Sequence, residues 1–183
     1  GTRSAPGRAR PIEGRARLEA LPDGDGRRDG HQGLDHQALH HPGGAAVVAL
    51  DAGNRVCLLR QYRHAAGGWL WELPAGKLDN AEAPLLCAQR ELEEEAGMQA
   101  ADWQPLGRIV SSPGVFTEVI HLYLACALSA VPVRLEEHEV IEVHWLPWAR
   151  AQHMAQVGEI EDAKTLAGLL RAQLPVAKLS ERR

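Results

Sequence analysis

The chain has 183 residues, and its 24 acidic and 20 basic side chains give a formal net charge of -4 at pH 7. This length is enough to bury the core of one domain, and the net negative charge gives no support for a nucleic-acid-binding surface. No apolar run approaches the roughly 20 residues that span a bilayer, and the polar start lacks the apolar core of a secretory signal, so we expect a cytoplasmic protein without membrane contact.

The N-terminal segment, residues 1–42, differs in composition from the rest of the chain. It is rich in Arg, Gly, Asp and His and poor in apolar periodicity, which predicts weak order or divergence. Its histidines could bind a transition metal, but no neighbouring cysteine or carboxylate pattern defines a geometry, so solvated side chains are the favoured interpretation. These histidines are His31, His36, His40 and His41.

One folded domain is predicted over residues 43–175, followed by a C-terminal tail at 176–183. The cysteines of the chain are odd in number and lie far apart among apolar residues, which predicts buried thiols without a disulfide or metal framework. They are Cys57, Cys87 and Cys126.

The first half of this domain begins with two β-rich segments, at 45–51 and 55–63, which flank the turn sequence DAGN. A short extended segment is predicted at 69–74. A helix is then predicted from Pro84, which is acceptable in a first turn, to Gly97, which suits a left-handed C-cap. Its apolar residues recur at helical spacing, namely Leu85, Ala88, Leu92 and Ala96.

The second half is β-rich at 106–110, 118–128 and 139–146, and a closing helix is predicted over 159–174. The leucines of this helix are expected to face the core, namely Leu166, Leu169, Leu170 and Leu174. Strands surrounding two principal helices predict an α/β fold, an α/β/α sandwich on a mixed β-sheet.

Three glutamates on the first helix carry the strongest chemical signal. Glu91, Glu94 and Glu95 stand at i, i+3 and i+4, so their carboxylates project from neighbouring positions on one face. Adjacent carboxylates repel one another unless cations neutralise them. Considered alone, the spacing favours a solvated acidic surface with pairs such as Arg90 to Glu94.

The wider pattern decides between these interpretations. Gly76 is followed after five residues by Glu82, and after seven more by Arg90, Glu91, Leu92, Glu93, Glu94, Glu95, Ala96, Gly97 and Met98. This pattern resembles the Nudix box at all of its specified positions. The resemblance implies a Nudix-type sandwich in which the box forms a loop, a helix and a loop around a divalent metal.

The resemblance also implies roles for individual residues. The metal would be Mg²⁺, with Mn²⁺ as a possible substitute, and its ligands would include the backbone carbonyl of Ala75. The other expected ligands from the box are Glu91, Glu94 and Glu95, and Glu94 is also expected to be catalytic. Glu82 and Arg90 would form a structural ion pair.

Motifs outside the box resemble those of ADP-ribose pyrophosphatases: RQYR at 60–63, WELPAGK at 71–77 and SSPG at 111–114. By this resemblance, Arg63 would face the phosphates, although an ordinary surface arginine is the alternative. A simple turn is the alternative for the SSPG loop. The remaining expected substrate-binding residues are Lys77, Ser112, Pro113, Gly114 and Glu118.

The catalytic base is expected outside the box, in the sequence LEEHEVIEVHWL at 135–146. In the resembling pyrophosphatases a glutamate on a loop before a late strand activates the water, which favours Glu137 as the base and Glu139 as a metal contact. Glu136 is the third acidic residue of this loop. A solvated acidic loop is the alternative.

The expected activity is Mg²⁺-dependent hydrolysis of ADP-ribose to AMP and ribose 5-phosphate. Hydrolysis of another nucleotide sugar such as GDP-mannose is one alternative, and a non-catalytic nucleotide-sensing Nudix module is another. The resembling enzymes commonly pair through an additional N-terminal sheet, so we expect a homodimer, although residues 16–41 hold only a hint of such strands. Besides a second copy of the chain, the expected partner is a small nucleotide-diphosphate substrate, and no nucleic acid or membrane partner is expected.

Overall fold

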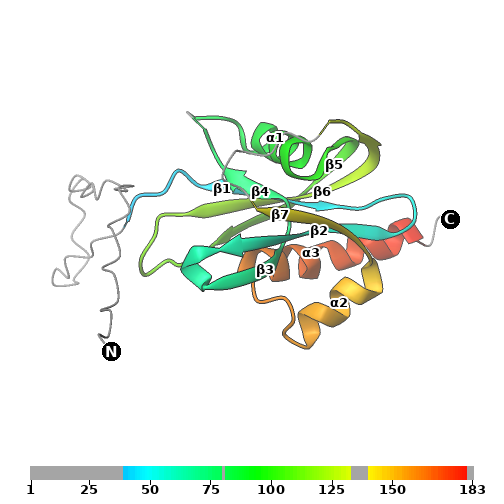
Figure 1. Ribbon diagram of the computed structural model, residues 1–183. Helices are drawn as coiled ribbons and strands as arrows, with labels where there is room; N and C mark the ends of the chain where they lie inside the picture. Colours follow the sequence, from blue (N-terminus) through cyan, green and yellow to red (C-terminus); the bar gives the residue numbers. More distant parts are fainter. Residues whose placement is uncertain (1–38, 80, 133–139, 181–183) are drawn as a thin grey trace, which may run out of the picture.

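The computed structural model describes residues 39–79, 81–132 and 140–180, and its core is built on two sheets (Figure 1). A four-stranded mixed sheet has the order β4-β1-β6-β5, in which β1 runs parallel to β6 and antiparallel to β4. Its strands are β1 (Gly44–Ala49), β4 (Ala75–Lys77), β5 (Met98–Val110) and β6 (Val119–Ala130). The second sheet is antiparallel, with the order β3-β2-β7, and contains β2 (Arg55–Arg63), β3 (Gly68–Glu72) and β7 (Ile141–Pro147).

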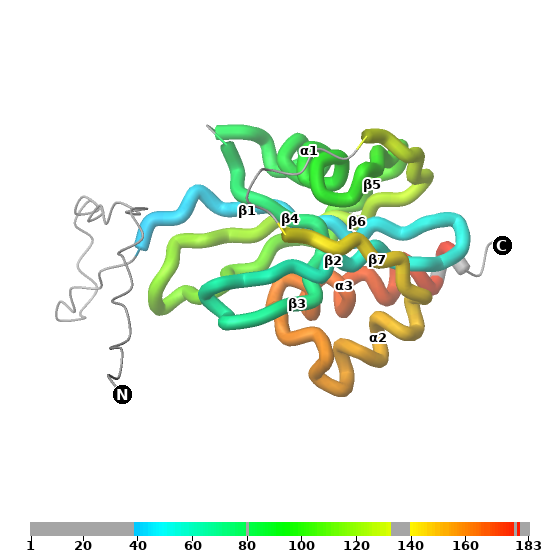
Figure 2. The backbone as a smooth tube through the Cα atoms, viewed as in Figure 1, coloured from blue at the N-terminus to red at the C-terminus, as the bar shows by residue number. Residues whose placement is uncertain are grey.

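Helices cover both sides of these sheets, as the tube trace shows (Figure 2). Helix α1 (Pro84–Ala96) lies on one side, and helices α2 (Trp148–Gln156) and α3 (Ala163–Ser180) lie on the other. A short 3-10 turn, η1 (His64–Ala66), links β2 to β3. The predicted α/β/α sandwich on a mixed sheet is therefore confirmed.

Strand β1 lies between β4 and β6 inside its sheet, and all six of its residues are buried. Successive side chains of a strand point to opposite faces. Val47 accordingly packs in the cluster that contains Leu92 of α1, whereas Val48 packs in the cluster that contains Leu169 of α3. One apolar strand thus supplies side chains to both cores.

Helix α1 has the bounds and the ends that the sequence predicts. Pro84 is in its first turn, and Gly97 adopts the left-handed conformation with φ 63°. The Gly97 N–H donates to the carbonyls of Glu93 and Leu92 and so satisfies the end of the helix.

Three elements differ from the sequence-based expectation. Strand β5 begins at Met98 rather than at 106, because it pairs with β6 along almost its whole length as an edge strand. Its partly exposed face weakens the apolar alternation that marks a strand, and a register shift between Pro105 and Gly107 interrupts it. Helix α2 was not predicted, and α3 continues past Pro175 to Ser180.

The prediction that all four leucines of the closing helix face inward is wrong for Leu170 and Leu174, which are 66% and 75% exposed. Leu169 is buried as predicted, and Ala172 and Val176 are buried with it, at a spacing of i, i+3 and i+7 that defines one helical stripe. Val176, which the sequence analysis assigned to a tail, therefore belongs to the core.

Two absences hold for the part of the chain that the structure describes. No helix there is long and apolar enough to cross a membrane. No disulfide joins cysteines among the described residues, and Cys57 and Cys87 are buried as predicted, whereas Cys126 is only half-buried. Burial raises the pKa of both the Cys57 and the Cys87 thiol to about 12.

Candidate active site

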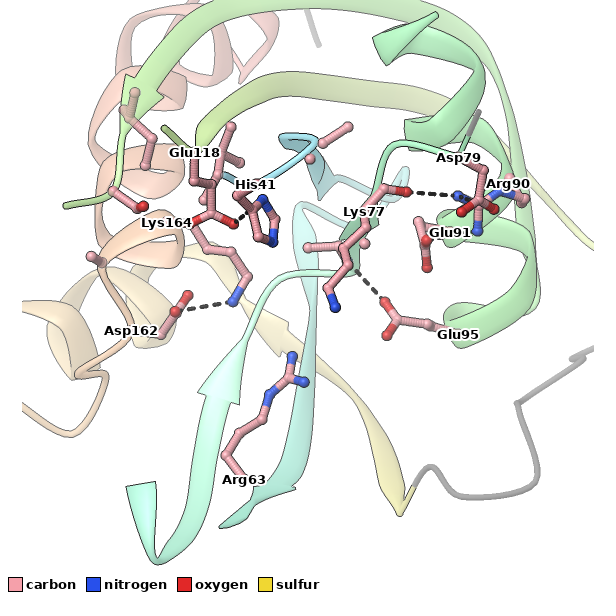
Figure 3. A pocket seen from close by; sticks show the side chains of 18 residues that line it. His41, Arg63, Lys77, Asp79, Arg90, Glu91, Glu95, Glu118, Asp162 and Lys164 are labelled. Atoms are coloured by element: carbon pink, nitrogen blue, oxygen red, sulfur yellow. Dashed lines mark hydrogen bonds and ion pairs between the residues drawn. The ribbon is translucent and has the colours of Figure 1, made fainter. Parts of the chain in front are cut away.

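A cavity of about 610 Å³ lies beside the central strand β1, within the size range of small-molecule sites (Figure 3). Its walls come from β1, the end of β2, β4, α1, the segment around Ser111 and Glu118, and the first turn of α3. Charged side chains from α1 and from α3 face this space from different walls. The cavity is therefore the place where the predicted box residues meet parts of the chain far from the box.

The box carboxylates form one wall. Glu91 and Glu95 are buried and line the cavity, whereas Glu94 is partly exposed and lies outside its lining. The backbone N–H of Ala75 donates to Oε2 of Glu95 at 2.8 Å, which joins strand β4 to helix α1. Arg90 Nη1 donates to Glu91 at 2.7 Å and to Glu94 at 3.1 Å, so one guanidinium holds two of the three box carboxylates that were predicted as ligands.

Arg90 also connects the box loop to the helix. Its Nη2 donates to Glu82 Oε2 at 3.1 Å and to the Lys77 carbonyl at 3.1 Å, and this confirms the predicted Glu82–Arg90 ion pair. The hydrogen bonds from Arg90 are the main cause of the lowered pKa of Glu82, and they outweigh its slight burial.

Gly76 permits the close approach of strand β4 to α1. A Cβ at this position would lie 1.7 Å from Oε1 of Glu91, so any larger residue would displace that carboxylate. The missing Cβ thus creates the space that the Glu91 side chain occupies.

The donor chemistry of this wall suits magnesium, which prefers carboxylate and carbonyl oxygens. Buried carboxylates also favour a nearby cation. However, no group of three or more His, Cys, Asp or Glu side chains among the described residues is arranged to hold a metal ion. In this geometry Arg90 bridges Glu91 and Glu94, so the predicted metal-ligand roles of Ala75, Glu91, Glu94 and Glu95 stay predictions.

A second group of charges, centred on Glu72, lies at the other side of the cavity. Glu72 is only 2% exposed and accepts two hydrogen bonds from Arg63, at 2.7 and 2.9 Å, and one from Lys164. Lys164 also donates to Asp162 at 3.0 Å. Burial alone would raise the pKa of Glu72, but the hydrogen bonds and charges of Arg63 and Lys164 prevail and lower that pKa to about 2.

Three of the predicted substrate-binding residues line the cavity, namely Arg63, Lys77 and Glu118. Ser111 lines it in place of the predicted Ser112, Pro113 and Gly114. These three residues belong to a tight turn, in which the Ser112 carbonyl accepts hydrogen bonds from the backbone N–H groups of Val115 and Phe116. Their predicted contact with substrate stays a prediction.

The predicted base Glu137 and the predicted metal contact Glu139 lie outside the described residues. Lys164 and Asp162 were not predicted as site residues, and His41 had no predicted role in the site, although it contacts Glu118 at 3.3 Å and lines the cavity. A partial signal for Asp162 was present, because an aspartate before a helix is a common N-cap. Asp162 accepts from the backbone N–H of Thr165 at 2.9 Å in that role.

Residues 40–169 match the protein-family model described as the NUDIX domain. An ADP-ribose pyrophosphatase of Mycobacterium tuberculosis (strain ATCC 25618 / H37Rv) is 40% identical over 140 residues, which cover 75% of this chain and 68% of that protein. A GDP-mannose pyrophosphatase of Escherichia coli (strain UTI89 / UPEC) is 34% identical over 151 residues, covering 76% and 78% of the two chains. A solved structure described as an ADP compounds hydrolase superposes with a TM-score of 0.65 at 20% identity over 74% of each chain, which supports the fold.

The sandwich fold and the intact box therefore define the class of the protein as a hydrolase built on this domain. The chain belongs to the Nudix family, and its resemblance to ADP-ribose pyrophosphatases is confirmed at the level of sequence similarity.

Proposed function

We propose that the protein is a Mg²⁺-dependent pyrophosphohydrolase that converts ADP-ribose to AMP and ribose 5-phosphate. The observation that carries this proposal is the cavity itself, in which the buried carboxylates Glu91 and Glu95 face the same space as the cations Arg63 and Lys164. Both phosphates of a diphosphate are stabilised by nearby positive charge. Negatively charged carboxylates can stabilise a phosphate only when they hold a cation beside it.

Glu91 and Glu95, with Glu94 and the Ala75 carbonyl, are the residues that would hold magnesium. Magnesium bound there would polarise phosphoryl oxygens and lower the pKa of a coordinated water. Arg90 positions Glu91 and Glu94 through its two hydrogen bonds, and Glu82 in turn holds Arg90. Glu137 is proposed to accept the proton of the attacking water.

The preference for ADP-ribose is supported by the higher identity to the ADP-ribose pyrophosphatase, 40% against 34% for the GDP-mannose enzyme. The WELPAGK motif also supplies Glu72, which holds Arg63 and Lys164 at the cavity. The GDP-mannose relative keeps that substrate as a second candidate. A sensing module has no need of the complete set of box carboxylates, which makes it the less favoured alternative.

A panel of ADP-ribose, GDP-mannose and NADH with magnesium, analysed by product chromatography, tests the proposal. We expect ADP-ribose to exceed the others by at least about tenfold in kcat/KM, or about 1.4 kcal/mol of transition-state binding. Excess chelator should abolish turnover, and Glu95→Gln should lower kcat strongly. Glu93→Gln is the matched control, because Glu93 contacts Gln99 at the surface, outside the cavity.

Each result has a distinct meaning. A clear preference for GDP-mannose would contradict the ADP-ribose assignment alone, and wild-type rates in excess chelator would reject the metal mechanism. Nucleotide binding without any turnover would favour the sensing module. The homodimer and the cytoplasmic location stay predictions of the sequence, and light scattering of the purified chain would contradict the dimer if it gave the monomer mass.

A further inference from the structure

Lys164 is a charged residue at the cavity for which the sequence gave no role. It is the second residue of α3, and its side chain is only 14% exposed. The Lys164 ammonium donates to Glu72 and to Asp162. An ammonium has three N–H donors, so these two bonds leave one donor for a ligand in the cavity that Lys164 lines.

Arg63 is arranged in a similar way on β2. Its Nε and Nη2 donate to the two oxygens of Glu72, which leaves Nη1 outside this bidentate pair. Figure 3 shows the guanidinium of Arg63 and the ammonium of Lys164 directed into the same space. One buried carboxylate therefore holds two cations side by side, although they stand 101 positions apart in the chain.

The two walls of the cavity present different charged side chains, although Arg90 also lines the α1 wall and Asp162 also lines the opposite wall. Glu91 and Glu95 lie on the α1 wall, whereas Arg63 and Lys164 lie on the wall formed by β2 and α3. Cations bound to the carboxylate wall would neutralise one phosphate of a diphosphate. The second phosphate then needs direct donors, and charge-assisted hydrogen bonds from Arg and Lys are the strong ones.

We propose that Lys164 is a second phosphate-binding residue beside Arg63, for which the family resemblance already implies a phosphate contact, and that Glu72 holds the two cations in position. The proposal rests on the proposed function as a diphosphate hydrolase. In this assignment Lys164 is a substrate-binding residue, and Glu72 is a positioning residue that acts through the two cations.

The alternative is that Lys164 only neutralises the buried Glu72. A purely structural role predicts that removal of the Lys164 charge lowers the stability of the fold but leaves anion affinity unchanged. A ligand role predicts a loss of anion affinity in protein that is still folded. Inorganic diphosphate separates the two, because its binding requires neither nucleotide recognition nor turnover.

The test is calorimetric titration of the full chain with inorganic diphosphate in metal-free buffer at low ionic strength, where screening is weak. We expect Lys164→Met to raise the Kd at least about tenfold, since a charge-assisted hydrogen bond is lost. Lys164→Arg should stay within about threefold of the wild type, because it keeps the charge. With ADP-ribose, Lys164→Met should raise KM much more than it lowers kcat.

Arg150→Met is the matched control, because Arg150 forms an exposed ion pair with Glu159 outside the cavity. Circular dichroism and thermal unfolding check the fold, and Lys164→Gln, which keeps a donor for Glu72, replaces Lys164→Met if the latter does not fold. An unchanged Kd in the folded neutral variant, an equal loss in Arg150→Met, or no diphosphate binding by the wild type would each overturn the proposal.

Failure of the Lys164 proposal can be distinguished experimentally from failure of the proposed hydrolase function. A wild type that binds diphosphate through Lys164 but hydrolyses no nucleotide sugar would contradict the activity and leave the anion site standing. A wild type that hydrolyses ADP-ribose while Lys164→Met keeps its Kd and KM would contradict only the anion site.

Discussion

Gly76→Ala is the substitution whose effect follows most directly from the geometry of the site. A Cβ at residue 76 would lie 1.7 Å from Oε1, 2.1 Å from Cδ and 2.7 Å from Oε2 of Glu91. The backbone of Gly76 is not in the left-handed region, so alanine adds no conformational strain of its own. The whole perturbation therefore falls on the Glu91 carboxylate.

The size of the displacement can be worked out from these distances. Side-chain atoms essentially never approach a Cβ closer than 3.0 Å, so Oε1 must retreat by at least the difference from 1.7 Å, about 1.3 Å. Glu91 would then lose its 2.7 Å hydrogen bond from Arg90. A misplacement of about 1 Å at a reacting site can cost about 10²-fold in rate, which corresponds to about 2.7 kcal/mol.

We therefore expect Gly76→Ala to lower kcat/KM for ADP-ribose about 10²-fold and to raise the magnesium concentration for half-maximal rate. The fold should persist, because a shifted side-chain rotamer costs only about 0.5–1.5 kcal/mol. A magnesium titration of the initial rate measures the change in activity and in magnesium requirement, and urea unfolding measures the stability of the fold. Gly68→Ala is the control, since nothing lies within 4 Å of its added Cβ. Wild-type magnesium dependence in folded Gly76→Ala would refute the reasoning.

Two further predictions concern titratable groups. The pKa of Glu72 in the folded protein, about 2, lies below its ordinary value of 4.5, so its contribution to stability is complete above about pH 4.5 and is lost as the pH falls toward 2. That contribution is at most about 3 kcal/mol and is reduced by solvent screening at Arg63, which is 41% exposed. Urea unfolding between pH 5 and 3 should show a steeper loss for the wild type than for Glu72→Gln, and equal slopes would contradict this. Glu137→Gln should lower kcat by about 10² to 10⁴ without changing the magnesium requirement, whereas Glu139→Gln should raise that requirement and Glu136→Gln should be almost silent; full kcat in Glu137→Gln would place the base elsewhere.

The parts of the fold that the sequence predicts well are those with strong local signals. Helix α1 is one of them, because Pro84 and Gly97 mark its ends and the apolar residues between them recur at helical spacing. Strand β5 lacks such a signal, since it lies at the edge of its sheet with many exposed residues. The inward face of α3 was predicted too wide, because the pattern of leucines did not separate Leu170 and Leu174 from the buried Leu169. Packing in the core cluster that contains Val48 and Leu73 selects the buried stripe.

The candidate site also has one part that the sequence predicts and one part that it does not. The contacts of Glu82, Arg90, Glu91 and Glu94 lie within one short segment, so residue spacing alone could bring them together. Glu72 and Lys164 are separated by 92 positions, and no periodicity relates a residue at the end of β3 to one at the start of α3. Such a contact follows from the tertiary packing of α3 against the sheets, which local patterns do not specify.

Thr165 explains how that packing positions Lys164 next to Glu72. This buried residue accepts a hydrogen bond from the backbone N–H of Leu73 at 2.9 Å and donates its hydroxyl proton to Asp162 at 2.6 Å. Leu73 follows Glu72 and Thr165 follows Lys164, so this buried contact brings the two charged neighbours together. An ion pair between flexible side chains tolerates many geometries, whereas a buried hydrogen bond to the backbone tolerates few. The position of Lys164 at the cavity is therefore set chiefly by the backbone of β3 and α3, and the ion pair with Glu72 then orients its ammonium.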